Sequence, residues 1–228
     1  MTKYALIIPT FENNIGYKMA ALNTFLQHTP KNMDIFFVYG GNQNLCTTGT
    51  INGVSYTDMY LKTPDSIFNV HKKLFNCFKK IVKKDYTHVL KIDDDTFLYN
   101  IDTFLDHKIS GDYVGEKIII EDEEATRNLL LHKKNYKIRD SYQGELPAHY
   151  CSGECVIFSK KAIESIVNYK GKEKYAKFGI EDIMLGNILL SNGFKINPNK
   201  FLNYEHPVKI DKFHKLYQMH YKKELVLS

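Results

Sequence analysis

Short apolar runs alternate along the chain with stretches in which apolar residues recur every three or four positions. Near-continuous apolar runs of five or six residues are typical of strands buried in a parallel sheet. Pro9 and the pair Gly40-Gly41 end the first two runs. The strands predicted in this way are residues 4–8, 34–39, 54–61, 87–92, 112–120 and 155–158.

The clearest predicted helix covers residues 65–84, where apolar side chains form one face and lysines fill the other. Asp65 or Ser66 is expected to cap it. Further helices are predicted over residues 16–28, 101–107, 160–169 and 180–192, and towards the end of the chain around His214 and His220. Residues 46–53, 121–140 and 171–177 are predicted to be loops.

The alternation of strands and helices predicts an α/β fold, a three-layer sandwich around a mainly parallel sheet. The 228 residues contain no internal repeat and no linker-like segment, so a single domain over residues 1–228 is expected.

The composition, 43% hydrophobic and 25% charged, excludes a disordered chain and a disulfide scaffold. The longest apolar runs are much shorter than a membrane span, and the first residues do not resemble a signal peptide. We therefore expect no membrane span, and a cytoplasmic protein or soluble domain. The four cysteines form no CxxC pair and are expected to be reduced thiols.

The formal net charge of +5 is compatible with anionic small ligands and gives little support to nucleic-acid binding. Only Arg127 and Arg139 are arginines, whereas nucleic-acid readers usually rely on arginine. No nucleic-acid partner is expected.

Three consecutive carboxylates, Asp93, Asp94 and Asp95, follow the apolar strand at residues 87–92. Ligands of open α/β sheets bind at the carboxyl ends of strands, where a divalent cation would offset the mutual repulsion. Mg²⁺ or Mn²⁺ takes oxygen ligands and bridges to a diphosphate. The alternative is an acidic turn with solvated side chains.

Two later segments carry weaker signals. Glu181 and Asp182 open a predicted helix, where acidic residues are favoured for electrostatic reasons alone. The functional alternative is that one of the two carboxylates accepts a proton from a hydroxyl as a general base. Gly153 precedes a short strand and permits close approach of a ligand, although a simple turn explains it too.

Histidines gather late in the chain at His206, His214 and His220, and an imidazole could complete a coordination sphere that begins with carboxylates. Because His206 precedes Pro207, an extended conformation is expected there. His214 is the alternative ligand.

Four stretches in order give a resemblance to a known family. Residues 65–73 are similar to a helix with an Asn-Leu-Thr-x-Lys core, and residues 91–95 match Lys-x-Asp-Asp-Asp. Residues 151–159 resemble Cys-x-Gly-x-x-Tyr-Val-x-Ser, and residues 181–186 resemble Glu-Asp-Val-x-x-Gly. The chain thus resembles the β-1,3-glycosyltransferases, which include galactosyl- and N-acetylglucosaminyltransferases and the Fringe proteins.

The resemblance implies a GT-A fold and an inverting, metal-dependent transfer from a nucleotide sugar, usually a UDP-sugar, to a glycan or glycoconjugate hydroxyl. Residues 1–100 would form the nucleotide-binding half and residues 101–228 the acceptor-binding half. Asp95 and His206 would hold Mn²⁺ or Mg²⁺, with Asp93 as a further ligand or close to the ribose, and Asp182 would be the general base. The nucleotide would lie near Pro9, Thr10, Lys73, Asp93, Asp94 and Gly153.

Two other classes remain open. A binding module could keep the fold without turnover, and an Mg²⁺-dependent phosphotransferase or nuclease could use the three aspartates. The chain has no Gly-rich phosphate loop, which disfavours the second class.

Overall fold

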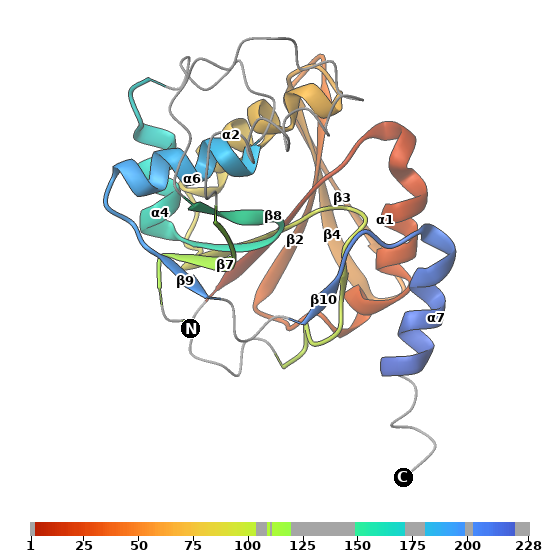
Figure 1. Ribbon diagram of the computed structural model, residues 1–228. Helices are drawn as coiled ribbons and strands as arrows, with labels where there is room; N and C mark the ends of the chain where they lie inside the picture. Colours follow the sequence, from red (N-terminus) through yellow and green to blue (C-terminus); the bar gives the residue numbers. More distant parts are fainter. Residues whose placement is uncertain are drawn as a thin grey trace.

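The fold is built on a mixed sheet of eight strands in the order β3-β4-β2-β1-β5-β8-β7-β9, counted over the described part of the chain (Figure 1). The computed structural model describes residues 3–103, 109, 111–119, 149–171, 181–198 and 203–221. The strands of this sheet are β1 (Tyr4–Pro9), β2 (Met33–Gly41), β3 (Leu45–Ile51), β4 (Val54–Lys62), β5 (His88–Ile92), β7 (Tyr113–Ile119), β8 (His149–Ser159) and β9 (Ile196–Pro198). A separate two-stranded ribbon pairs β6 (Phe97–Leu98) with β10 (Tyr204–Glu205).

The centre of the sheet is parallel, because β4, β2, β1 and β5 all run in the same direction. All six residues of β1 are buried, as expected of a strand covered on both faces. Beyond β5 the sheet continues with the antiparallel strands β8 and β7. The prediction of an α/β sandwich around a mainly parallel sheet is confirmed.

Helices cover both faces of the sheet and enclose two cores (Figure 1). The helices are η1 (Glu12–Asn14), α1 (Ile15–Leu22), η2 (Phe25–His28), η3 (Ile67–Asn69), α2 (Val70–Ile81), α4 (Lys160–Asn168), α6 (Glu181–Ser191) and α7 (Ile210–His220). On one face α2, α4 and α6 contribute buried residues such as Phe78, Ile163 and Leu185. On the other face α1, η2 and α7 contribute Leu22, Phe25 and Phe213.

Helix α2 confirms the strongest sequence pattern, but its start differs from the prediction. The chain first makes the single turn η3, and α2 begins only at Val70. Asp65 is not used as a cap: it accepts hydrogen bonds from the Gly40 amide at 2.9 Å and from Lys73 Nζ at 2.9 Å. Asp65 therefore joins α2 to the end of β2.

The predicted loop at residues 46–53 is wrong, because most of it forms the edge strand β3. This strand pairs with β4 in a hairpin, and Ile51 faces Val54 across the closing turn. Asn52 and Gly53 have φ values of 51° and 80°, as a two-residue Asn-Gly hairpin turn requires. Threonine also favours strands, so the Asn-Gly pair and the threonines before it were the overlooked signal.

Two other elements differ in extent. The helix predicted over residues 16–28 breaks at Thr24, whose hydroxyl donates a hydrogen bond of 2.6 Å to the Ala20 carbonyl and so competes with the backbone. The strand predicted at residues 155–158 is the longer β8. Part of the helix predicted over residues 101–107, and the loops predicted over 121–140 and 171–177, lie outside the described residues.

The expected thiols are present: all four cysteines are free, three of them buried and Cys46 exposed. Among the described residues, no helix combines the length and the apolar character that crossing a membrane requires.

Candidate functional site

The three aspartates leave the sheet at the carboxyl end of β5, as predicted. The ladder between β5 and β8 ends at the pair Ile92 and Cys155, and the Asp93 amide then donates to the Glu154 carbonyl at 3.2 Å. The Thr96 amide donates to the Asp93 carbonyl at 3.2 Å, which closes a tight turn. The turn directs successive carboxylates towards different neighbours.

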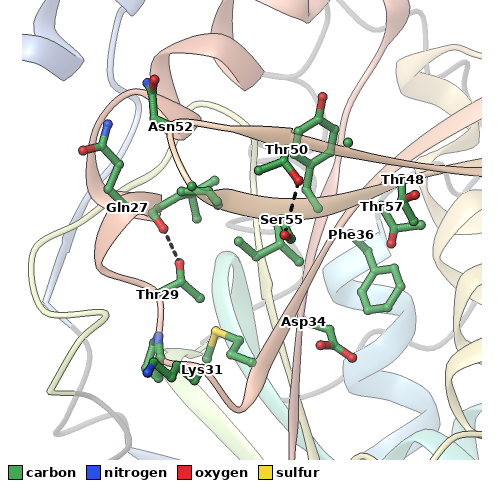
Figure 2. Close-up of a pocket in the computed structure, with 18 of the residues that line it drawn as sticks. Gln27, Thr29, Lys31, Asp34, Phe36, Thr48, Thr50, Asn52, Ser55 and Thr57 are labelled. Carbon is green, nitrogen blue, oxygen red and sulfur yellow. Dashed lines mark hydrogen bonds between the residues drawn. The ribbon is translucent and has the colours of Figure 1, made fainter.

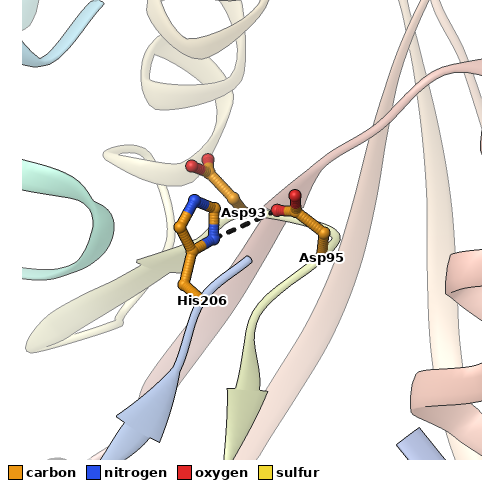
Figure 3. A group of neighbouring side chains, drawn as sticks. All are labelled: Asp93, Asp95 and His206. Carbon is orange, nitrogen blue, oxygen red and sulfur yellow. Dashed lines mark ion pairs between the residues drawn. The ribbon is translucent and has the colours of Figure 1, made fainter. Parts of the chain in front are cut away.

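The small ribbon of β6 and β10 brings His206 to this turn. Glu205 pairs with Phe97, so His206 continues level with Thr96. The Val208 amide donates to the Asp95 carbonyl at 2.8 Å and fixes the returning chain. His206 Nδ1 lies 3.2 Å from Asp95 Oδ1 (Figure 3). The same nitrogen lies 3.2 Å from Thr96 Oγ1.

Asp93, Asp95 and His206 form a group whose ligand atoms all lie within 4.8 Å of one another (Figure 3). All three side chains are partly buried. Two carboxylates and an imidazole are a donor set that suits a first-row divalent ion such as Mn²⁺. The residues present therefore fit a divalent metal.

The charged groups around this site shift the pKa values of one another. Burial alone would lower the pKa of His206, but the hydrogen bond and the charge of Asp95 outweigh it, so the His206 pKa is raised. Burial, together with the nearby Glu181 charge, raises the pKa of Asp93 despite the opposing effect of Lys91. A divalent cation would relieve both the burial cost and the repulsion.

Asp94 points to the neighbouring strand and not to the metal group. It accepts a hydrogen bond of 2.6 Å from Thr10 Oγ1 and one of 3.0 Å from Asn14 Nδ2. Thr10 is fully buried, and its amide donates to the Val38 carbonyl at 2.9 Å. Because β1 and β5 are parallel neighbours, Pro9 and Thr10 end at the same level of the sheet as the aspartates.

Lys73 lies beneath Thr10 and is fully buried. Its ammonium donates to the Thr10 carbonyl at 2.7 Å and to Asp65 Oδ1 at 2.9 Å, and it stands 3.6 Å from the centre of the Phe11 ring. Burial lowers the Lys73 pKa despite the Asp65 carboxylate. In this arrangement Lys73 supports Thr10 and Phe11 from below.

Asp182 lies at the start of α6, next to Glu181. Its Oδ1 accepts a hydrogen bond of 2.8 Å from the Ile183 amide, so the helix N-terminus orients the carboxylate. Gly153 of β8 lies against this turn: a methyl group on it would be 3.3 Å from Asp182 Cβ and 3.4 Å from Lys91 Nζ. The missing side chain of Gly153 is what lets β8 approach both groups so closely.

His214, the alternative ligand, lies elsewhere. It is exposed on α7, and its Nε2 is 2.9 Å from Gln218 Nε2 one turn later. The metal-ligand group found among the described residues contains His206 and not His214.

Several residues of the site were given no role from the sequence. Glu154 Oε1 lies 3.8 Å from His206 Nε2, and Lys91 is buried between Asp93 and Glu181. A lysine in the middle of an apolar strand was a usable signal, because a buried lysine requires partners. Asn14 and Glu154 carried no local signal, since their roles depend on contacts between distant segments.

Two cavities differ in their relation to this site. One of about 440 Å³ is lined by Phe11, Glu12, Asn13, Asn14, Asp65 and Ile67, and its lining thus begins at the residue after Thr10. Another of about 890 Å³ lies against the hairpin of β3 and β4 and the start of β2, and includes Asp34, Thr48 and Ser55 (Figure 2). Since β2 and β4 begin there, it lies at the end of the sheet opposite the aspartates.

The site thus combines an acidic turn after a central strand, a histidine that completes the metal-ligand group, and a helix that begins with two acidic residues. The model of the galactosyltransferase family matches residues 23–200. The chain belongs to the galactosyltransferase family and is a glycosyltransferase. The match includes the three aspartates, Gly153 and Asp182, whereas Thr10 and His206 lie outside it.

No curated protein matches the chain. Among solved structures, A197 from STIV is 11% identical with a TM-score of 0.45, covering 92% of this chain and 87% of that one. A variant of Drosophila β1,4-galactosyltransferase 7, in complex with manganese, UDP-Gal and xylobiose, is 11% identical with a TM-score of 0.46, covering 94% and 74%. The glycosyltransferase GlyE of Streptococcus pneumoniae TIGR4 is 12% identical with a TM-score of 0.47, covering 88% and 46%.

Proposed function

We propose that the protein is an inverting glycosyltransferase of the GT-A type that uses a divalent metal ion to transfer a sugar from a UDP-sugar to a hydroxyl of a glycan or glycoconjugate. The observation that carries this proposal is the group of Asp93, Asp95 and His206 at the carboxyl end of β5. It stands next to a helix that begins with two carboxylates. Family membership supplies the reaction class.

Asp95 and His206 would be the principal metal ligands. Asp93 already gives one carboxylate oxygen to Lys91 at 2.5 Å, so it has less capacity left for the ion. The imidazole favours Mn²⁺ over Mg²⁺, which prefers oxygen ligands. When bound, the ion would stabilise the negative charge that develops on the departing diphosphate.

The nucleotide would lie over Pro9 and Thr10 and extend into the adjoining 440 Å³ cavity. Asp94, held by Thr10 and Asn14, would form one wall beside the ribose. Lys73 would act from beneath, through Thr10. Gly153 would border the sugar end of the donor, where β8 comes closest to α6.

Asp182 would be the general base. The Ile183 amide orients it, whereas Glu181 faces the Lys91 ammonium at 3.4 Å and is less free to accept a proton. The acceptor oxygen would form a bond to the anomeric carbon as its proton passes to Asp182. The bond from that carbon to the β-phosphate oxygen would break, so UDP leaves and the configuration is inverted.

A donor screen tests this proposal. The protein is incubated with UDP-, GDP- and TDP-sugars, a panel of glycan acceptors and Mn²⁺, and both the released nucleotide and the glycosylated product are measured. We expect UDP release and a product of inverted anomeric configuration, both abolished by chelation and restored by Mn²⁺. Transfer at full rate after exhaustive chelation would overturn the metal assignment, and release of inorganic phosphate would overturn the reaction class.

A further inference from the structure

A fully buried lysine, Lys91, lies between the metal-ligand group and the start of α6. It belongs to β5, where its neighbours Leu90 and Ile92 point into the core on one face. The Lys91 side chain points to the opposite face, the one that α6 covers. A lysine is rarely buried completely unless its charge is paired.

Three acceptors surround the Lys91 ammonium, each from a different segment. Asp93 Oδ1 lies at 2.5 Å and Glu181 Oε1 at 3.4 Å, and the Gly153 carbonyl oxygen accepts a short hydrogen bond. The ammonium thus has one acceptor for each of its three N–H donors.

We infer that Lys91 is a positioning residue that holds the general-base end of α6 in register with the metal-ligand turn. This inference rests on the proposed function. Asp182 follows Glu181 directly, so whatever fixes Glu181 also fixes Asp182. The contacts of Lys91 with Asp93, Gly153 and Glu181 are called the Lys91 tether below.

The donor side of the site has supports of its own. Asp95 is fixed through Val208 and His206, and Asp94 is fixed by Thr10 and Asn14. Asp93 does lose Lys91, but its backbone keeps its hydrogen bonds with Glu154 and Thr96, so loss of the tether should leave donor binding largely intact. It should impair the proton transfer that requires Asp182 at a fixed place, which is a loss in kcat.

The test compares Lys91→Met with Lys18→Met. Lys18 is an equally suitable buried lysine: its side chain is 5% exposed and pairs with Asp58 at 2.6 Å, on the face covered by α1. Both variants lose a buried ion pair, so both are destabilised. We expect kcat to fall by about tenfold or more only in Lys91→Met, as when a general base is misplaced, while the Kd for UDP in the presence of Mn²⁺ changes less than about threefold.

Glu181→Ala removes the contact between Lys91 and α6 by changing the partly buried residue of the pair. It tests the inference even if Lys91→Met does not fold. It should lower kcat as Lys91→Met does, and the double variant should be no slower than the slower single variant. An unchanged kcat in either folded single variant, or losses that multiply in the double variant, would overturn the inference.

A second readout needs no substrate. Amide hydrogen exchange in the first turns of α6, at Ile183 to Leu185, should be faster in Lys91→Met than in Lys18→Met. Equal exchange in the two variants would contradict the tether. If the wild-type protein transferred no sugar from any donor, the proposed function would fail while this comparison would still decide the inference about Lys91.

Discussion

At the residue scale, each of the three aspartates contacts different neighbours. Asp93 faces Lys91, Asp94 faces Thr10 and Asn14, and Asp95 faces His206. Adjacent carboxylates with identical side chains therefore have different environments, and the pKa values of Asp93 and Asp94 are both raised, mainly by burial. The different roles proposed for them above rest on these contacts and not on residue type.

The acidic pair of α6 gives the first prediction. Asp182→Asn keeps the shape and the oxygen that accepts from the Ile183 amide but removes the basic group, so kcat should fall by about 10² to 10⁴ while UDP still binds. The measurement is a steady-state rate at saturating donor and acceptor, with calorimetry of UDP binding.

The matched control is Asp211→Asn, because Asp211 is also an acidic residue in a first helical turn, that of α7. It should lose only helix-terminus stabilisation, about 0.3–1 kcal/mol, and no rate. If Glu181→Gln lost the rate while Asp182→Asn did not, the base would be Glu181.

His206 gives the second prediction. His206→Ala removes a metal ligand, so the Mn²⁺ concentration for half-maximal activity should rise by about tenfold or more, within the range seen for weakened metal sites. His214→Ala is the control, since His214 is exposed on α7. A rise for His214→Ala with none for His206→Ala would transfer the ligand role.

At the scale of elements, the close approach of α6 to β8 places Asp182 beside Gly153. A glycine in α6 permits this approach: a methyl group on Gly186 would lie 2.5 Å from Tyr150 Cβ and 3.3 Å from Tyr150 Cα. Such contacts cannot be relieved by a side-chain rotation, because the atoms belong to or adjoin the backbone of β8. Helix α6 would have to move away from the sheet.

The third prediction follows from this contact. Gly186→Ala should lower the free energy of unfolding by about 1–3 kcal/mol, as overpacking does, although alanine favours helices. It should also lower kcat, because α6 carries Asp182. Urea unfolding and steady-state kinetics provide the measurements.

Gly16→Ala in α1 is the control for a helical glycine. Its methyl group would meet Ile210 Cδ1 at 2.9 Å, the far end of a flexible side chain that can rotate away. We expect a stability within about 1 kcal/mol of the wild type, favoured by the better helix propensity. Equal destabilisation by Gly186→Ala and Gly16→Ala would show that the contact between Gly186 and Tyr150 is not the cause of the loss of stability.

The sequence predicted elements best where one pattern dominated over many residues. The amphipathic pattern of α2 and the apolar run of β1 predicted those elements correctly. Strand β3 was missed because its threonines and glycine have no apolar alternation, and its place at the sheet edge leaves most of its side chains exposed. An edge strand is specified mainly by its partner and its turn.

Local patterns also explain which parts of the site could be predicted from the sequence. The aspartates and the acidic pair of α6 have local motifs. His206 meets Asp95 across a separation of more than a hundred residues through the β6 and β10 pairing, which the sequence pattern did not predict. The partners of Lys91 and the position of Glu154 depend on the register of β5 against β8, and a single sequence does not specify that register.

At the scale of the whole molecule, the parallel strands direct all candidate groups to one end of the sheet. β1 ends at Thr10 and β5 at Asp93, and β8 passes Gly153 and Glu154 alongside them. The returning ribbon adds His206 and helix α6 adds Asp182. The sheet and the elements packed on it thus bring together groups from five segments, and transition-state stabilisation requires groups positioned in this way.

The central claim is that a divalent ion held by Asp95 and His206 joins the nucleotide to the protein. The most direct test is thermal unfolding with UDP alone, Mn²⁺ alone and both together, for the wild type and for Asp95→Ala. At about 100 times its Kd, UDP with Mn²⁺ should add about 2.7 kcal/mol, a rise in Tm of roughly 5–10 °C for a chain of this size. UDP alone should have little effect, and Asp95→Ala should abolish the joint rise. An equal rise with UDP after exhaustive chelation, or an undiminished joint rise in Asp95→Ala, would contradict the claim.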